Sequence, residues 1–98
     1  MRIFHLYQAL ADEKREAEFW KAQDPELEEA FVDELEGAIE LIKKAPEGYA
    51  RASKRTELRR FVERRFQTAI LYRYIKDDDL LVIARVYNCR MDPKRFLS

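Results

Sequence analysis

Three consecutive strand-like runs in the second half of the chain constrain its fold more than any other feature. The runs cover residues 58–62, 66–74 and 80–87, and the short polar turns 63–65 and 76–79 join them. β-Branched and aromatic residues are frequent in these runs, whereas Gly and Pro are absent, which is typical of a pleated sheet. Because turns this short join antiparallel neighbours, the sequence predicts a three-stranded antiparallel meander.

A short strand and a helix are predicted before the meander. Residues 2–7 alternate polar and apolar side chains, and residues 9–22 are rich in the helix formers Ala, Glu, Lys and Arg. We expect Leu10, Ala17 and Trp20 to share the inner face of this helix, with Phe19 beside them. The apolar stripe is thin, so the helix is expected to pack on one side only.

Asp24 and Pro25 mark the start of a second helix, because Asp caps free backbone amides and Pro suits the first helical position. Its apolar side chains then recur at the helical spacing of three or four residues: Leu27, Phe31, Leu35, Ala38 and Ile42. Most acidic side chains fall on the other side, where we expect a solvated face. The helix ends before Pro46 and Gly48, and its closeness to the first helix predicts an antiparallel hairpin.

The predicted element order is β-α-α-β-β-β. We expect one α+β domain over residues 1–98, in which the helical hairpin packs on one face of a small antiparallel sheet. The other sheet face is then partly open to solvent or to a partner. The polar and basic residues 49–57 are expected to form a loop.

Charge is distributed unevenly along the chain, although the net charge is zero. Residues 1–50 carry six basic and 13 acidic side chains, and residues 51–98 carry 13 basic and six acidic ones. The halves therefore differ in sign, at −7 and +7, and the basic half can attract an anionic partner. A single cysteine, a polar N-terminus and the lack of any apolar run of roughly 20 residues favour a cytoplasmic protein without a membrane segment.

The sequence contains no phosphate-binding loop, metal-ligand spacing or catalytic triad, so neither a metal nor a cofactor is expected. His5 and Cys89 are interpreted as structural residues. The candidate binding groups are instead basic and aromatic, because arginine binds phosphates and carboxylates and aromatic rings stack on bases. They are Arg51, Lys54, Arg55, Arg59, Arg60, Arg64, Arg65, Arg73, Arg85, Arg90, Lys94 and Arg95, with Tyr72, Tyr74, Tyr87 and Phe96 among them.

Three interpretations of these groups remain open from the residues alone. They can form a nucleic-acid surface, a dock for an acidic protein segment, or a solvated sheet face whose arginines pair with the acidic helices.

The order and spacing of several motifs resemble the RelE/ParE superfamily of bacterial toxins, also called plasmid stabilisation proteins. Residues 31–42, followed by Pro46, are similar to the second helix of ParE-type toxins. Residues 58–61, 64–66 and 70–74 are similar to the central strands, and residues 90–93 to the closing arginine-x-Asp-Pro motif. The similarity covers nearly the whole chain.

The resemblance implies one of two activities. RelE-like members cut messenger RNA on the ribosome, whereas ParE-like members inhibit DNA gyrase by binding it. Both kinds are silenced by a cognate antitoxin whose extended segment wraps the toxin.

The residues favour the ParE-like activity. RelE-type enzymes supply arginines from the third strand and the C-terminal segment, and a terminal tyrosine. The matching positions here are Ala69, Arg90 and Phe96, and neither Ala69 nor Phe96 can donate or accept a proton. We therefore expect a ParE-like toxin of a type II toxin–antitoxin system that acts by protein–protein binding rather than as an enzyme.

Two alternatives stay open beside it. One is a RelE-like endoribonuclease that uses Arg64, Arg65, Arg73 and Arg90 on the ribosome and its messenger RNA. The other is a non-toxic interaction domain that keeps the fold.

The expected partners are a cognate antitoxin and DNA gyrase in the bacterial cytoplasm, and oligomers can form through the antitoxin. An antitoxin segment with acidic and apolar residues suits the charge of the basic half. The predicted partner-binding residues are Arg59, Arg60, Arg64, Arg65, Arg73, Arg85, Arg90 and Phe96.

Overall fold

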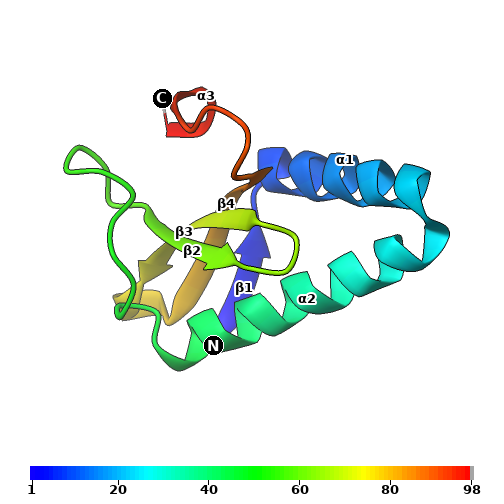
Figure 1. The fold of residues 1–98 in the computed structure, drawn as a ribbon. Helices are drawn as coiled ribbons and strands as arrows, with labels where there is room; N and C mark the ends of the chain where they lie inside the picture. The colour runs from blue at the N-terminus through cyan, green and yellow to red at the C-terminus, as the bar shows by residue number, and fades with distance from the viewer. Residues whose placement is uncertain (98) are drawn as a thin grey trace.

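A computed structural model describes residues 1–97 and arranges them as a four-stranded sheet with a helical hairpin beside it (Figure 1). In chain order the elements are β1 (Arg2–His5), α1 (Tyr7–Gln23), α2 (Pro25–Lys44), β2 (Arg59–Glu63), β3 (Thr68–Ile75), the short 3-10 helix η1 (Lys76–Asp78), β4 (Leu80–Asn88) and α3 (Lys94–Leu97). The predicted α+β fold and its order of strand, two helices and three strands are confirmed. Within residues 1–97, none of the helices combines the length and apolarity needed to span a bilayer.

The sheet has the strand order β1-β4-β3-β2. Strands β2, β3 and β4 form the predicted antiparallel meander, in which Ile70 lies opposite both Phe61 and Val86. The first strand adds a feature that was not predicted, because β1 pairs with β4 in parallel, with Ile3 beside Leu81. The sheet is therefore mixed.

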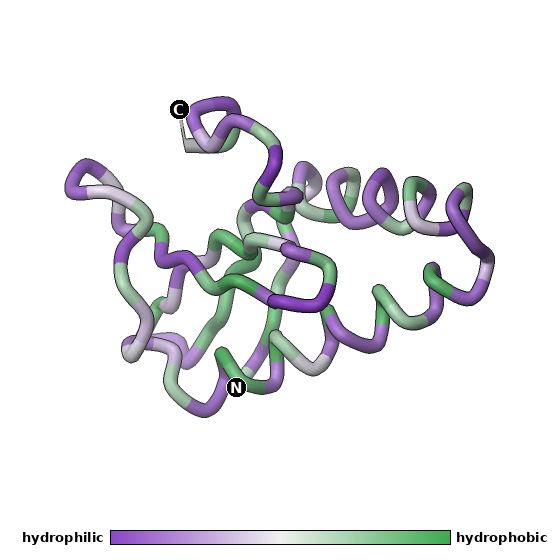
Figure 2. Tube along the Cα trace, in the orientation of Figure 1, coloured by the Kyte–Doolittle hydropathy of each residue, from purple (hydrophilic) through white to green (hydrophobic). Residues whose placement is uncertain are grey.

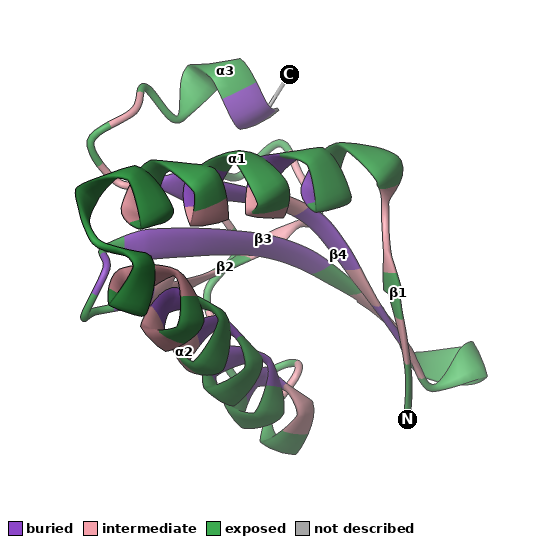
Figure 3. Cartoon of the chain, turned by 90° about the vertical axis from the view of Figure 1, so that its right-hand side faces the viewer, coloured by how far each residue is buried: buried purple, intermediate pink, exposed green. Residues whose placement is uncertain are grey.

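The main core lies between α2 and the sheet. Asp24 caps α2 as predicted, since its Oδ1 accepts a hydrogen bond from the Glu26 N–H at 2.9 Å. The predicted stripe is buried along most of its length, at Phe31, Leu35, Ala38 and Ile42, and it packs against Ile70, Tyr72, Leu81, Ile83 and Val86. Hydrophobic segments run through the strands (Figure 2), and burial follows β3, β4 and the inner sides of both long helices (Figure 3).

The packing of α1 corrects the prediction for Leu10, whereas Ala17 and Trp20 pack against the main core as expected. Leu10 is 54% exposed, and the buried residues of this helix are Ala9, Asp12 and Glu16. The reason is that β1 pairs with β4 only as far as Ile83, and α1 packs beside β4. There Asp12 accepts a hydrogen bond from the Val86 N–H at 3.0 Å, so a carboxylate satisfies a backbone donor of β4 beyond the end of β1.

The third predicted strand begins two residues late, at Thr68 rather than Phe66. The buried Glu63 carboxylate accepts hydrogen bonds from the N–H groups of Arg65 and Phe66, and Gln67 adopts a positive φ of 56°. These contacts extend the turn, so Phe66 leaves the strand and packs into the main core.

A second, smaller core covers part of the opposite sheet face. Ala69, Leu71, Tyr87 and Phe96 are buried together, and Cys89 packs against them as the structural, half-buried residue that was expected. Figure 1 shows the C-terminal segment with α3 folded back above one end of the sheet. This face is therefore more closed than the sequence predicted.

Candidate functional site

The structure does not gather the predicted partner-binding arginines on one surface. Arg59 donates a hydrogen bond to the Tyr49 carbonyl oxygen at 2.6 Å, and Arg73 pairs with Glu57 at 3.2 Å. Both arginines line a hollow of about 460 Å³ beside the loop that precedes β2. These two side chains thus have partners within the fold, and they lie together with Arg51.

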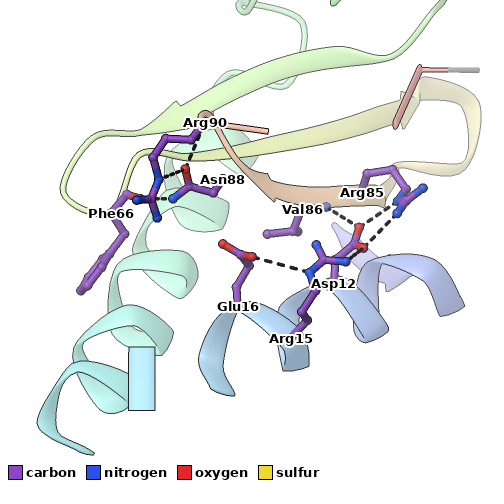
Figure 4. A network of polar contacts seen from close by, with 8 residues as sticks. All are labelled: Asp12, Arg15, Glu16, Phe66, Arg85, Val86, Asn88 and Arg90. Carbon is purple, nitrogen blue, oxygen red and sulfur yellow. Dashed lines mark hydrogen bonds and ion pairs between the residues drawn. The ribbon is translucent and has the colours of Figure 1, made fainter. Parts of the chain in front are cut away.

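Arg85 is held by a buried carboxylate within the fold. Its Nε and Nη2 donate to the two carboxylate oxygens of Asp12 at 2.8 and 2.9 Å, as Figure 4 shows. Asp12 is 1% exposed, and it also accepts from Arg15 Nη1 at 3.2 Å. The hydrogen bonds to Asp12 raise the pKa of Arg85. Here the interpretation that sheet arginines pair with acidic helices is correct.

Arg65 and Arg90 are brought together in a groove between α1, the β2–β3 turn and the C-terminal segment, which we call the Arg90 groove. It consists of two adjoining hollows, of about 320 and 250 Å³, that share Asn88 and Arg90. The remaining lining residues are Arg15, Glu16, Phe19, Trp20, Arg65, Phe66, Gln67 and Met91.

Arg90 is positioned by its neighbours and remains exposed. Its Nε and its backbone N–H both donate to Oδ1 of Asn88, at 3.0 and 2.9 Å. Asn88 is itself fixed, since its Nδ2 donates to the Phe66 carbonyl oxygen at 3.1 Å (Figure 4). The guanidinium carbon lies 5.6 Å from the Phe19 ring centroid, a cation–π geometry. The arrangement presents a pre-oriented cation at the mouth of the groove.

Two α1 side chains, one acidic and one aromatic, also line the groove. Burial raises the pKa of Glu16, which lies 3.6 Å from the Arg15 guanidinium. Trp20 Nε1 is buried without a hydrogen-bond partner in residues 1–97, although its ring packs edge-on against Phe66 at 4.9 Å. The groove therefore combines arginines with an aromatic surface, which suits a carboxylate next to an apolar side chain.

The remaining predicted residues lie elsewhere. Arg64 is exposed in the β2–β3 turn and lines neither hollow of the groove. Arg60 lies on the other face of the sheet, where its Nε donates to the Tyr87 hydroxyl at 3.3 Å. Phe96 is 6% exposed and stacks on Tyr87, with ring centroids 4.3 Å apart, so it is a core residue.

The residues named for the endoribonuclease alternative do not converge. Arg65 and Arg90 share a hollow, but Arg73 lies five residues along β3 from Thr68, a strand distance of roughly 17 Å, and lines another hollow. Only two of the four alternative catalytic arginines are therefore brought together.

Sequence reasoning missed the contribution of α1. Asp12, Glu16, Phe19 and Trp20 either hold strand arginines or line the Arg90 groove. A signal was present, because Asp12 and Glu16 share the helix side that carries Ala9, at spacings of three and four residues. Acidic residues on an inward side indicate buried partners of opposite charge.

No protein-family model matches the chain, and neither does any curated protein sequence. A solved structure described as "Chromosomal ParDE TA system from P. aeruginosa" is similar, with a TM-score of 0.73 and 21% sequence identity. The match covers 90% of this chain and 95% of that chain. At this identity the likeness shows the fold, which is the ParE-like fold that the sequence motifs implied.

Proposed function

We propose that this chain, which has the fold of the ParE-like toxins, is the toxin of a type II toxin–antitoxin pair. It inhibits DNA gyrase by binding to the enzyme, and a cognate antitoxin neutralises it. Inhibition by binding requires neither a cofactor nor a reaction catalysed by this chain.

The observation that carries this proposal is the sheet face opposite the main core. The buried side chains of Ala69, Leu71, Tyr87 and Phe96 fill this face, which we call the filled sheet face. The position that the resemblance aligns with a catalytic arginine is Ala69, which is fully buried with Leu71 and Tyr87 under Phe96. Cleavage of RNA requires groups that move a proton from the ribose 2′-hydroxyl and stabilise the charged phosphate. Apolar side chains at this place supply neither, which favours action by binding.

The Arg90 groove is the surface we assign to the target. Protein targets are held by aromatic and arginine anchors at the centre of an interface, and the groove supplies both kinds in Phe19, Trp20, Arg65 and Arg90. The complementary segment on the target carries a carboxylate beside an apolar side chain.

An assay of purified chain with purified gyrase tests the proposal. Micromolar chain is expected to block supercoiling of relaxed plasmid, and Arg90→Ala is expected to raise the half-inhibitory concentration at least about 10-fold, since an interfacial arginine contributes more than about 1.4 kcal/mol. Arg55→Ala is the matched control, because Arg55 is exposed in the loop and lines no hollow described above. That variant is expected to inhibit like the parent chain.

The same preparation is added to translating ribosomes, and the transcripts are mapped. Intact transcripts are the expected result. Cut transcripts without gyrase inhibition would establish the endoribonuclease alternative, and activity in neither assay would leave only the non-toxic interaction domain.

A further inference from the structure

Two arginines face each other where the loop before β2 pairs with the start of that strand. Arg51 in the loop forms an antiparallel bridge with Arg59, the first residue of β2. The two backbone hydrogen bonds of this bridge join the residues on either side of the pair, so the two arginine side chains lie in the closest cross-strand arrangement. Like charges directly opposite each other are destabilising, and within residues 1–97 neither arginine has an ion pair. An anion between the two guanidinium groups would remove this repulsion.

Both side chains line the hollow of about 460 Å³ beside this loop, which projects from one end of the sheet (Figure 1). We call it the Arg51 hollow. Arg73 from β3 and Lys76 from η1 also line it, so four cations surround the space. Arg73 pairs with Glu57 at 3.2 Å, but both side chains are more than half exposed, and an exposed ion pair of this kind is weak. An entering anion can therefore compete with Glu57 for Arg73.

A backbone donor lies next to the same space. Arg59 pairs with Tyr72, and β3 continues to Ile75, so the last part of β3 passes beyond the start of β2. The backbone groups of Arg59 face β3, because those of its two neighbours bond to the loop. Alternation along β3 then turns the Tyr74 N–H to the side of β2, where the strand is missing and the Arg51 hollow lies. A backbone N–H beside arginines is a donor set that suits phosphate.

The acidic part of the lining distinguishes between classes of phosphate ligand. Glu47 and Asp77 line the hollow and are exposed, and together with Glu57 they repel a continuous polyanion such as a nucleic-acid strand. Carboxylates instead accept hydrogen bonds from hydroxyl and amino groups, and the Tyr74 ring beside them offers a face for a heterocycle. The volume of the hollow is that of a small-molecule site. The lining therefore suits a single phosphate group joined to a sugar and a base.

We propose that the Arg51 hollow binds a nucleoside phosphate. The phosphate lies between Arg51 and Arg59 and accepts a hydrogen bond from the Tyr74 N–H. Glu47 and Asp77 accept hydrogen bonds from hydroxyl and amino groups of the sugar and base. This binding does not rest on the proposed function, because the hollow shares no residue with the groove that we assign to the target.

The test is an NMR titration of the full-length chain, labelled with ¹⁵N, in a buffer without phosphate. The probes are the common ribonucleoside 5′-monophosphates, their nucleosides, inorganic phosphate and a short single-stranded DNA. At least one nucleotide is expected to shift the amide signals of Arg51, Arg59 and Tyr74 with a Kd at or below about 1 mM, at least about 10-fold tighter than its nucleoside and inorganic phosphate.

Three results of this titration overturn the proposal. If no nucleotide shifts these amide signals, the hollow is not a nucleotide site. If inorganic phosphate binds as tightly as every nucleotide, the arginines hold an adventitious ion only. If the DNA binds at this place as tightly as the best nucleotide, the ligand is a nucleic-acid strand and the acidic lining does not exclude it.

Substitutions then locate the site. Arg51→Gln is expected to weaken the nucleotide at least about 10-fold, because it removes one of the two opposed guanidinium groups. Arg55→Gln is the matched control, since Arg55 is exposed in the same loop and lies outside the hollow, and it is expected to bind like the parent chain. Glu47→Ala is expected to weaken the nucleotide but not inorganic phosphate. Unchanged nucleotide affinity in Arg51→Gln and Glu47→Ala contradicts the assignment.

Thermal unfolding gives a second measurement on the same variants. Because the opposed arginines repel each other in the free chain, Arg51→Gln is expected to raise the Tm without nucleotide, whereas Arg55→Gln is expected to leave it unchanged. Added nucleotide is expected to raise the Tm of the parent chain more than that of Arg51→Gln. A Tm of free Arg51→Gln at or below that of the parent chain would show that the arginine pair needs no anion.

Discussion

Asp12 and Arg85, 73 residues apart in sequence, form a bidentate ion pair that joins α1 to β4. The same carboxylate accepts the Val86 N–H, so it satisfies a charged group and a backbone donor together. This contact sets the position of α1, whose C-terminal half forms one side of the Arg90 groove.

Asp12→Ala is expected to lower the free energy of unfolding by about 3–5 kcal/mol, because it leaves a strand arginine and a backbone N–H without their partner. Asp12→Asn keeps an acceptor for Val86 and is expected to lose less. Urea unfolding of both variants, combined with Arg85→Ala in a double-mutant cycle, measures the coupling. Additive effects of Asp12→Ala and Arg85→Ala would show that the pair does not stabilise the fold.

The buried hydroxyl of Tyr72 is expected to make the stability of the fold sensitive to alkaline pH. Its hydroxyl donates to the Pro46 carbonyl oxygen at 2.9 Å, and burial raises its pKa from 10.0 to about 12. A group with a raised folded pKa stabilises the fold fully below its unfolded pKa and loses that contribution as the pH rises toward the folded value. The protein is therefore expected to lose about 2–3 kcal/mol of stability between about pH 10 and pH 12 from this group.

Tyr72→Phe is expected to cost about 1 kcal/mol at neutral pH and to remove this part of the alkaline loss. Tyr7→Phe is the control, because Tyr7 is 83% exposed. Chemical denaturation at pH 8, 10 and 11.5 compares them, and equal pH dependence in the two variants would contradict the assignment to Tyr72.

Phe96 is expected to anchor the C-terminal segment over the sheet. It stacks on Tyr87, and the Arg85 guanidinium carbon lies 4.7 Å from its ring centroid. Phe96→Ala is expected to cost about 3 kcal/mol and to speed the reaction of Cys89, which packs in the same cluster, with a thiol reagent. Phe4→Ala, at a 57% exposed position, is the control, and equal labelling rates in the two variants would show that the segment stays in place without Phe96.

The sequence predicted those parts of the fold that local patterns determine. The α2 stripe from Phe31 to Ile42 and the cap at Asp24 follow the helical period and capping chemistry, and both are confirmed. The meander was equally readable, because its strands are joined by short turns. Its largest boundary error, the two-residue shift of the strand start from Phe66 to Thr68, arose because the Glu63 carboxylate extends the turn through contacts that propensity does not reveal.

The remaining features depend on pairs distant in sequence. The parallel addition of β1 and the inward side of α1 follow from which edge of β4 is left free, and no local pattern reports that. For the same reason the sequence identified the candidate arginines but could not separate those held by partners within the fold from those that line a groove. Arg85 is held by Asp12, whereas Arg90 is aimed into a groove by Asn88.

The most direct test of the central claim is inducible expression in a bacterial host, with pulse labelling of DNA and protein synthesis in parallel. Binding and inhibition of gyrase predict that DNA synthesis falls first, with a DNA-damage response, and that protein synthesis falls later. If protein synthesis stops first while DNA synthesis continues, the chain acts on translation, and the filled sheet face does not prevent action on RNA.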